Sequence, residues 1–246
     1  MTLAIAIAGA SGRMGAALLQ AASADARFAI AGSTTRGGET VERAAIQADA
    51  WIDFTTPDAT LASLDALATT PVRAAVIGTT GLSAEQEAKI AIHAKRIAIV
   101  RSGNFSLGVN LLAALVEQAA QKLGPGWDIE ITEAHHRRKV DAPSGTALML
   151  GEAAARGRGK TLGELRTPPR DGITGAREPG AIGFSVIRAG GIIGEHDVRF
   201  GAEREVLTLS HEALDRGLFA DGALTAALWA ADKPAGLYTM RDVLGL

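Results

Sequence analysis

The 246-residue sequence contains no cysteine, so it forms no disulfide and has neither a thiolate nucleophile nor a cysteine-ligated metal site. Aromatic residues make up only 4% of the chain, which leaves few platforms on which single-stranded nucleic acid could stack. Neither sign of charge dominates: 25 Lys and Arg residues stand against 27 Asp and Glu residues, without the basic excess of a nucleic-acid-binding protein. No apolar run reaches the ~18 residues of a membrane span. These absences lead us to expect a cytoplasmic protein without nucleic-acid or membrane partners.

What is present is an ordinary globular composition, with 47% hydrophobic and 21% charged residues. The length predicts one large domain or two small ones. The apolar N-terminal stretch lacks the basic residues that open a signal peptide, and its glycines fall where a strand would turn into a helix. We therefore expect this stretch to belong to the folded protein.

Short apolar runs alternate with helical patterns over the first hundred residues, which is typical of a parallel sheet with helices on its faces. This order predicts an α/β fold with a Rossmann-like, doubly wound parallel sheet. The strands are expected at Leu3–Ala8, Phe28–Gly32, Ala50–Phe54, Val72–Gly78 and Ile97–Val100. The helices are expected at Ala16–Ala22, Pro57–Ala68 and Ser83–Lys95, the last with a capping box in which Ser83 is the cap and Gln86 lies three residues later.

The pattern changes after Ser106, where a long amphipathic helix precedes a strand of alternating polarity. Helices are expected at Leu107–Lys122, Ser144–Arg156 and, finally, Gly222–Ala231. Strands are expected at Asp128–Glu133, Phe184–Arg188, His196–Phe200 and Val206–Ser210, with a long loop at Gly157–Gly183. We expect a dinucleotide-binding domain at residues 1–105, completed by residues 214–246, and a second, α+β domain at residues 106–213.

A glycine-rich turn follows the first strand and opens the first helix. Its glycines permit a tight turn and close approach of the backbone, and the helix start offers N–H groups to a pyrophosphate. The alternative is a turn that is rich in glycine for packing reasons alone. Its position favours a dinucleotide site with the candidate residues Gly9, Ser11, Gly12, Arg13, Met14 and Gly15.

The end of the second strand lacks the carboxylate that would hold the ribose 2′-hydroxyl of NAD, since none occurs before Glu39. Arg36, together with Arg13, suits a 2′-phosphate instead. This predicts NADPH as the preferred cofactor, with NADH as the second choice. The alternative is that Arg36 is a solvated loop charge.

Two polar turns lie just past the fourth and fifth strands, at the edge of the sheet where ligands bind in open α/β folds. Ordinary turn chemistry would explain the same residue types. Their position favours contact with the cofactor by Gly78, Thr79, Thr80, Asn104 and Phe105.

The most informative segment runs from Glu133 to Thr146. His135, His136 and Lys139 bring proton donors together, and either type of group could transfer a proton or bind a carboxylate. The helix start that follows, Ser144–Thr146, offers backbone N–H groups and hydroxyls to an anion. Three alternatives are a solvated basic face, a nucleic-acid patch and a metal site made by the histidines with Glu133 or His196. Adjacent histidines on a strand point to opposite faces, which argues against the metal site.

The run from His135 to Ala147 closely resembles the signature of the dihydrodipicolinate reductase family, now called 4-hydroxy-tetrahydrodipicolinate reductases. Other blocks match in order along the whole chain: Gly9–Gly15, Ile52–Thr55, Gly78–Gly81, Asn104–Asn110, Asp171–Arg177, Arg188–Gly190, Gly194–His196 and Met240–Leu244. The resemblance implies an NAD(P)H-dependent oxidoreductase of lysine and diaminopimelate biosynthesis. Such an enzyme reduces 4-hydroxy-tetrahydrodipicolinate to tetrahydrodipicolinate by hydride transfer.

The resemblance also implies site roles by motif position. His135 would be the proton donor, and Lys139 a second donor that also binds the substrate. His136 would contact one substrate carboxylate, and Ser144, Gly145 and Thr146 the other. No metal is implied. Family members are usually homotetramers that associate through the sheet of the second domain, and they often accept both cofactors, with an acidic residue near the position of Arg36.

Two other functions compete with this assignment. One is an NADP-dependent dehydrogenase for another small dicarboxylate. The other is a non-catalytic NADP(H) sensor, which would have no need of the proton donors His135 and Lys139.

Overall fold

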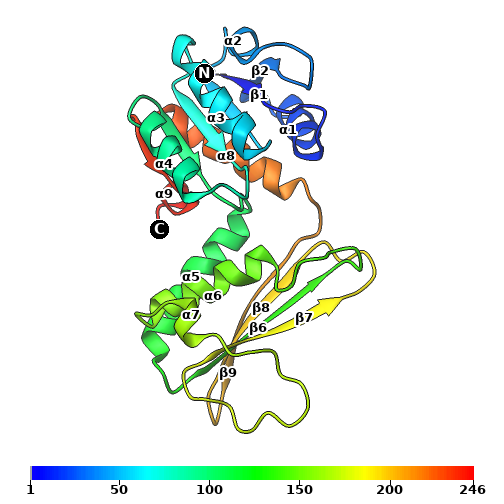
Figure 1. The fold of residues 1–246 in the computed structure, drawn as a ribbon, viewed down its shortest axis with the longest axis vertical. Helices are drawn as coiled ribbons and strands as arrows, with labels where there is room; N and C mark the ends of the chain where they lie inside the picture. The colour runs from blue at the N-terminus through cyan, green and yellow to red at the C-terminus, as the bar shows by residue number, and fades with distance from the viewer. Residues whose placement is uncertain (1) are drawn as a thin grey trace. The chain divides into compact units, whose positions relative to one another are not determined.

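The structure is a computed structural model that describes residues 2–246. These residues form two compact units (Figure 1): one runs to Leu107 and resumes over Gly217–Leu246, and the other is Gly108–Arg216. The first is a helix-covered parallel sheet and the second a mixed sheet with helices, so the predicted fold class is confirmed. No helix within residues 2–246 combines the length and the apolar character needed to cross a membrane.

The first unit is built on a six-stranded sheet in which every described pairing is parallel, in the order β10-β5-β4-β3-β1-β2. The strands β3 and β4 are buried along their whole length, as their continuous apolar character predicts. Since the strands are parallel, their carboxyl ends share one edge. The bounds are β1 (Leu3–Ile7), β2 (Phe28–Ser33), β3 (Ala50–Asp53), β4 (Ala74–Ile77), β5 (Ala98–Arg101) and β10 (Gly236–Tyr238).

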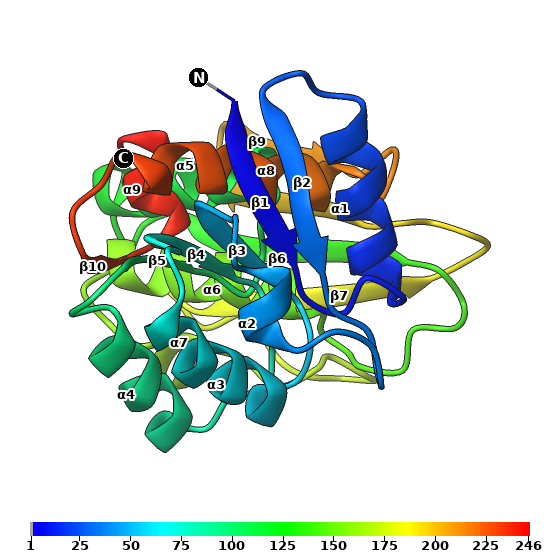
Figure 2. The same ribbon diagram turned by 90° about the horizontal axis from the view of Figure 1, so that it is seen from above.

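Helices cover both faces of this sheet, as Figure 2 shows. On one face lie α1 (Arg13–Ser23) and α8 (Leu218–Ala231), with Met240 of the short α9 (Met240–Leu244) in the same core. On the other face lie α2 (Val41–Ala44), α3 (Pro57–Ala66), η1 (Leu67–Thr69) and α4 (Ala84–His93). The predicted capping box at the start of α4 is present, with Ser83 and Gln86 bonded reciprocally.

The second unit holds a four-stranded sheet in the order β7-β6-β8-β9. Its strands are β6 (Asp128–His135), β7 (Ile182–Arg188), β8 (Glu195–Gly201) and β9 (Val206–Glu212), and only the pair β6–β7 is parallel among those described. One face packs against α5 (Leu107–Leu123), α6 (Gly145–Gly157) and α7 (Leu162–Leu165). Along β6, Ile129 and Ile131 point into this core. Because side chains alternate in a strand, Glu133 and His135 continue the same face beyond the apolar core.

The sequence prediction missed several short elements. The helix expected at Gly222–Ala231 is present as α8, but it is not the last element, because β10 and α9 follow it; the expected loop at Gly157–Gly183 contains α7. The strand expected to end at Glu133 continues to His135, and α1 begins at Arg13 rather than Ala16. Elements of three to five residues carry too few positions for a hydrophobic period to be visible.

Candidate active site

The predicted glycine-rich turn joins β1 to α1. Gly9 has a φ of +65°, and the Gly12 N–H donates to the Gly9 carbonyl oxygen at 2.9 Å. A side chain at Gly15 would overlap that same carbonyl, so α1 starts directly against the turn. Ser11, Gly12 and Arg13 are exposed at the helix start. The six predicted residues therefore form one turn with the geometry of an anion-binding helix start, in which Ser11, Gly12 and Arg13 are exposed while Met14 and Gly15 pack inward.

The two polar turns at the carboxyl ends of β4 and β5 are only partly accessible. The Thr79 side chain is buried, and its Oγ1 lies 2.7 Å from Thr60 Oγ1. Both hydroxyls also reach the buried Asp53 carboxylate, at 3.2 Å from Thr60 and 3.4 Å from Thr79. Phe105 is buried against Phe54 in an edge-to-face contact with ring centroids 5.2 Å apart. A bound molecule would therefore meet the backbone of these turns and the exposed Thr80.

Arg36 lies in the turn that follows β2, and its side chain is exposed. The turn contains no carboxylate before Glu39, which pairs with Arg43 at 3.4 Å. The exposed Arg36 can reach a ligand without breaking a described ion pair.

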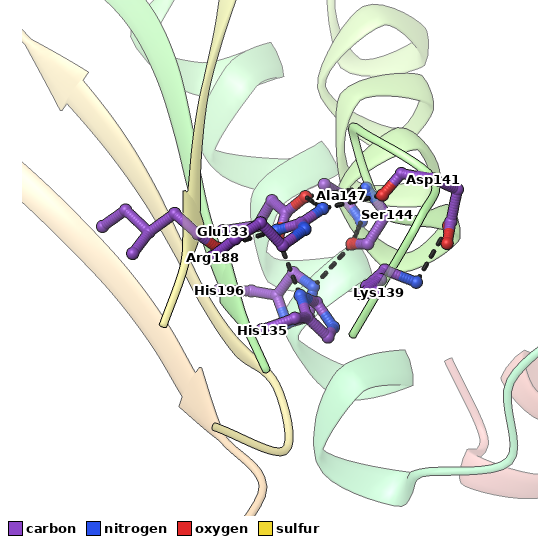
Figure 3. Close-up of polar contacts among 9 residues, drawn as sticks. Glu133, His135, Lys139, Asp141, Ser144, Ala147, Arg188 and His196 are labelled. Carbon is purple, nitrogen blue, oxygen red and sulfur yellow. Dashed lines mark hydrogen bonds and ion pairs between the residues drawn. The ribbon is translucent and has the colours of Figure 1, made fainter. Parts of the chain in front are cut away.

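In the second unit, the predicted residues His135 and Ser144 contact the buried carboxylate of Glu133, and Lys139 lies in the same region (Figure 3). Glu133 Oε2 lies 2.7 Å from His135 Nδ1, and Oε1 accepts the Ser144 N–H at 2.9 Å. Arg188 adds a bidentate pair, with Nη1 on Oε2 and Nη2 on Oε1, both at 2.7 Å. One carboxylate thus holds the end of β6, the end of β7 and the start of α6.

Ser144 caps α6 from a buried position. Its Oγ accepts the Ala147 N–H at 3.1 Å and lies 3.0 Å from His196 Nε2 on β8. The rings of His196 and His135 meet edge to face, with centroids 5.2 Å apart. The next residue, Gly145, is exposed, and a side chain there would meet nothing within 4 Å. Buried hydrogen bonds therefore fix Ser144 at the start of α6, while the backbone of Gly145 remains exposed.

Lys139 and His136 complete the group of predicted residues. Lys139 Nζ lies 2.8 Å from Asp141 Oδ2, in the loop between β6 and α6. His136 is half-buried just past the end of β6, and its Nδ1 is a buried atom with no hydrogen-bond partner among the described residues. Both side chains have polar atoms that a ligand could engage.

The electrostatics follow from burial and from these partners. Burial acts to raise the pKa of Glu133, but the hydrogen bonds from Arg188, His135 and the Ser144 amide together hold it below its ordinary value. The Lys139 ammonium lowers the pKa of Asp141. Burial, and then the charges of Arg138 and Arg216, lower the pKa of His136. Burial, with His135 nearby, lowers the pKa of His196 to about 4, so His196 is neutral at pH 7.

Sequence reasoning did not find Arg188 as a site residue, and it considered Glu133 and His196 only as metal ligands. Arg188 is 55 positions from Glu133, and only the parallel pairing of β6 with β7 brings them together. Within residues 2–246, no cluster of three or more His, Asp or Glu side chains has the arrangement of a metal site. One feature of the sequence could have identified Glu133 as a site residue. It lies two positions before His135 on the predicted strand, and residues two apart on a strand share a face.

The depressed pKa of His196 makes the stability of the fold depend on pH. Below its ordinary pKa of 6.5 the unfolded chain takes up a proton that the folded protein takes up only near pH 4, so stability falls as the pH drops between these values. At about pH 5 the loss is ~1–2 kcal/mol, given 1.36 kcal/mol per pKa unit. We expect the free energy of unfolding of His196→Gln, measured by urea unfolding, to fall by ~1–2 kcal/mol less than that of the wild type when the pH is lowered from about pH 7.5 to about pH 5. An equal loss in both proteins would contradict this.

Comparisons with known proteins agree with this geometry. The family described as "Dihydrodipicolinate reductase, N-terminus" matches residues 3–105, and "Dihydrodipicolinate reductase, C-terminus" matches residues 108–244. The 4-hydroxy-tetrahydrodipicolinate reductase of Caulobacter vibrioides is 57% identical over 98% of this chain and 96% of its own. The corresponding protein of Rhizobium rhizogenes is 50% identical over 98% and 96%.

Solved structures give the same assignment. The dipicolinate-bound dihydrodipicolinate reductase from Paenisporosarcina sp. TG-14 has a TM-score of 0.79 at 25% identity, covering 97% of this chain and 98% of that one. An amine dehydrogenase from Mycobacterium smegmatis, at 13% identity and a TM-score of 0.64 over 98% of this chain and 95% of that one, shares the fold. The resemblance found in the sequence is therefore confirmed, and the chain belongs to the dihydrodipicolinate reductase family.

Proposed function

We propose that this chain acts as the names of its relatives state, as a 4-hydroxy-tetrahydrodipicolinate reductase in lysine and diaminopimelate biosynthesis. The observation that carries the proposal is the exposed start of α6 beside His135 and Lys139. A cyclic substrate with two carboxylates matches an anion-binding helix start with cationic side chains and proton donors around it. The relative that was solved with dipicolinate, an aromatic dicarboxylate, supports the same substrate class.

One substrate carboxylate is proposed to lie at Ser144, Gly145 and Thr146, and His136 and Lys139 bind the other. Gly145 is exposed and offers backbone at the helix start. The tautomer of His196 supports a role for the Ser144 hydroxyl. A buried Nδ1–H without an acceptor would be costly, so the proton of neutral His196 lies on Nε2 and is donated to Ser144 Oγ. Ser144 Oγ then accepts two hydrogen bonds, which leaves its own proton available to a carboxylate.

The glycine-rich turn fits the cofactor, because the start of α1 is exposed and the backbone of Gly15 packs directly on Gly9. Gly9, Ser11, Gly12, Arg13, Met14 and Gly15 would hold the pyrophosphate, with Gly78, Thr79, Thr80, Asn104 and Phe105 at the same sheet edge. When bound, the reduced nicotinamide supplies the hydride. The chain's own part in the chemistry is to orient the substrate and to supply a proton from His135 or Lys139.

The proposed proton donors are tested by substitution. We expect His135→Gln and Lys139→Met each to lower kcat by about 100-fold or more, the scale of general acid–base catalysis. The measurement is oxidation of the reduced cofactor, coupled to a synthase that generates the substrate. Near-normal kcat in both variants would overturn these roles, and an inactive wild type would overturn the proposed function.

We also propose that the chain prefers NADPH and uses NADH less well, because Arg36 is exposed where a 2′-phosphate would lie. Arg36→Ala should lower kcat/KM for NADPH by about tenfold, the size of one charge-assisted contact, and leave the value for NADH unchanged. The matched control is Arg43→Ala, another exposed arginine of this region, which should change neither value. Preference for NADH in both the wild type and Arg36→Ala would contradict the assignment.

A cytoplasmic homotetramer completes the proposal. The face of the second sheet opposite its helices carries exposed apolar side chains, among them Ile187 and Val206 at 47% and 64% exposure. Exposed apolar residues on a sheet face suit association between copies. Sedimentation equilibrium should give the mass of a tetramer, and a monomer at micromolar concentration would contradict this.

A further inference from the structure

Glu133 has no part in the function proposed above, yet it is the most completely engaged side chain of the second unit's site. Its side chain is fully buried. Each carboxylate oxygen has two partners: His135 and Arg188 for Oε2, and the Ser144 amide and Arg188 for Oε1. Removing an ionised carboxylate from water is costly, and these contacts offset that cost only if all the partners donate.

The partners determine where the protons lie. The guanidinium of Arg188 and the Ser144 N–H are donors in every protonation state near neutrality, and they keep Glu133 ionised. An ionised carboxylate only accepts hydrogen bonds, so the hydrogen bond to His135 requires a proton on Nδ1. When His135 is neutral, its Nε2 is consequently bare. When His135 is charged, Nε2 carries the proton that it can give away.

The surroundings of Nε2 agree with this role. Gly194, next to β8, has no side chain, and a Cβ there would stand 3.2 Å from His135 Nε2 and crowd it. The charged or titratable groups around the ring are Arg188 on β7, His196 on β8, and His136 and Lys139 in the following loop. Of these, His196 is neutral at pH 7 and the others add no negative charge. Glu133 is the carboxylate in hydrogen-bond contact with the ring.

We infer that Glu133 is a positioning residue that fixes the Nδ1–H tautomer and the ring orientation of His135, so that His135 presents Nε2 for proton transfer. Arg188 holds Glu133 in place and, through a 2.8 Å hydrogen bond to the Asp141 carbonyl oxygen, also holds the loop that carries Lys139. This inference rests on the proposed function for its catalytic consequence. The tautomer itself is a property of the free protein.

A first experiment needs no substrate. In protein labelled with ¹⁵N-histidine, the nitrogen shifts of His135, assigned by their loss in His135→Gln, report which nitrogen carries the proton once the ring is neutral. We expect Nδ1–H in the wild type, and a shift of the population toward Nε2–H in Glu133→Gln. An Nε2–H tautomer in the wild type would overturn the inference even if the protein proves to be the proposed reductase.

Kinetics test the consequence for catalysis. In Glu133→Gln we expect kcat to fall on the order of 100-fold and KM to change by less than about threefold, because the amide oxygen of Gln can still accept the Ser144 N–H and keep the start of α6 in place, while His135 loses its charged acceptor. Glu133→Asp keeps the charged acceptor and should restore much of the wild-type kcat. A purely structural role would instead lower the thermal midpoint and leave the tautomer of His135 in the folded protein unchanged.

Two further variants keep the test decisive. If Glu133→Gln fails to fold, the double variant Glu133→Gln/Arg188→Met removes both charges together and should show the same shift of His135 toward the Nε2–H tautomer. Glu130→Gln is the matched control on the same strand, because Glu130 pairs with Arg177 at 3.0 Å, away from His135. It should leave kcat and the tautomer of His135 unchanged. A folded Glu133→Gln protein with wild-type kcat would contradict the inference.

Discussion

The second unit depends on the ion pair between Glu133 and Arg188, made where β6 and β7 run parallel and end together. A buried charge is costly unless its hydrogen bonds are complete, and this requirement joins segments that are distant in the sequence. Because one Glu133 oxygen also accepts the Ser144 amide, the pair determines where α6 begins. Because the other contacts His135, it also determines how that ring is oriented. A single constraint thus positions both the start of α6 and the ring of His135.

The first unit differs in that the site proposed for the cofactor pyrophosphate consists mainly of backbone groups. Its parallel strands end at one edge, where a glycine turn brings the exposed start of α1. The polar side chains nearest that edge bond to one another, as Thr60, Thr79 and Asp53 do, and so stiffen the edge. Such an edge can hold a pyrophosphate through N–H groups with little dependence on individual side chains. Under the proposed function, the choice between NADPH and NADH then depends on an exposed residue such as Arg36.

Much of this could be predicted from the sequence because the signals are local. Continuous apolar runs predicted β3 and β4, and Ser83 with Gln86 predicted the start of α4. The segment from His135 to Thr146 marked the site, since residues close in sequence supply most of it. Contacts made by pairing of distant strands left no such signal. Arg188 and His196 reach the site only because β7 and β8 flank β6. The hydrophobic pattern of the sequence does not show which strands are neighbours in the sheet. The short β10 and α9 were missed because three to five residues cannot display a period.

The family assignment and the geometry of the second unit both support the proposal that a buried carboxylate orients one imidazole and one helix start toward a small dicarboxylate. A crystal structure with bound dipicolinate tests this most directly. The account predicts one carboxylate at the backbone of Gly145, the other near His136 and Lys139, and the ring beside Nε2 of His135. Dipicolinate bound elsewhere, or bound here with Nδ1 of His135 turned away from Glu133, would contradict it.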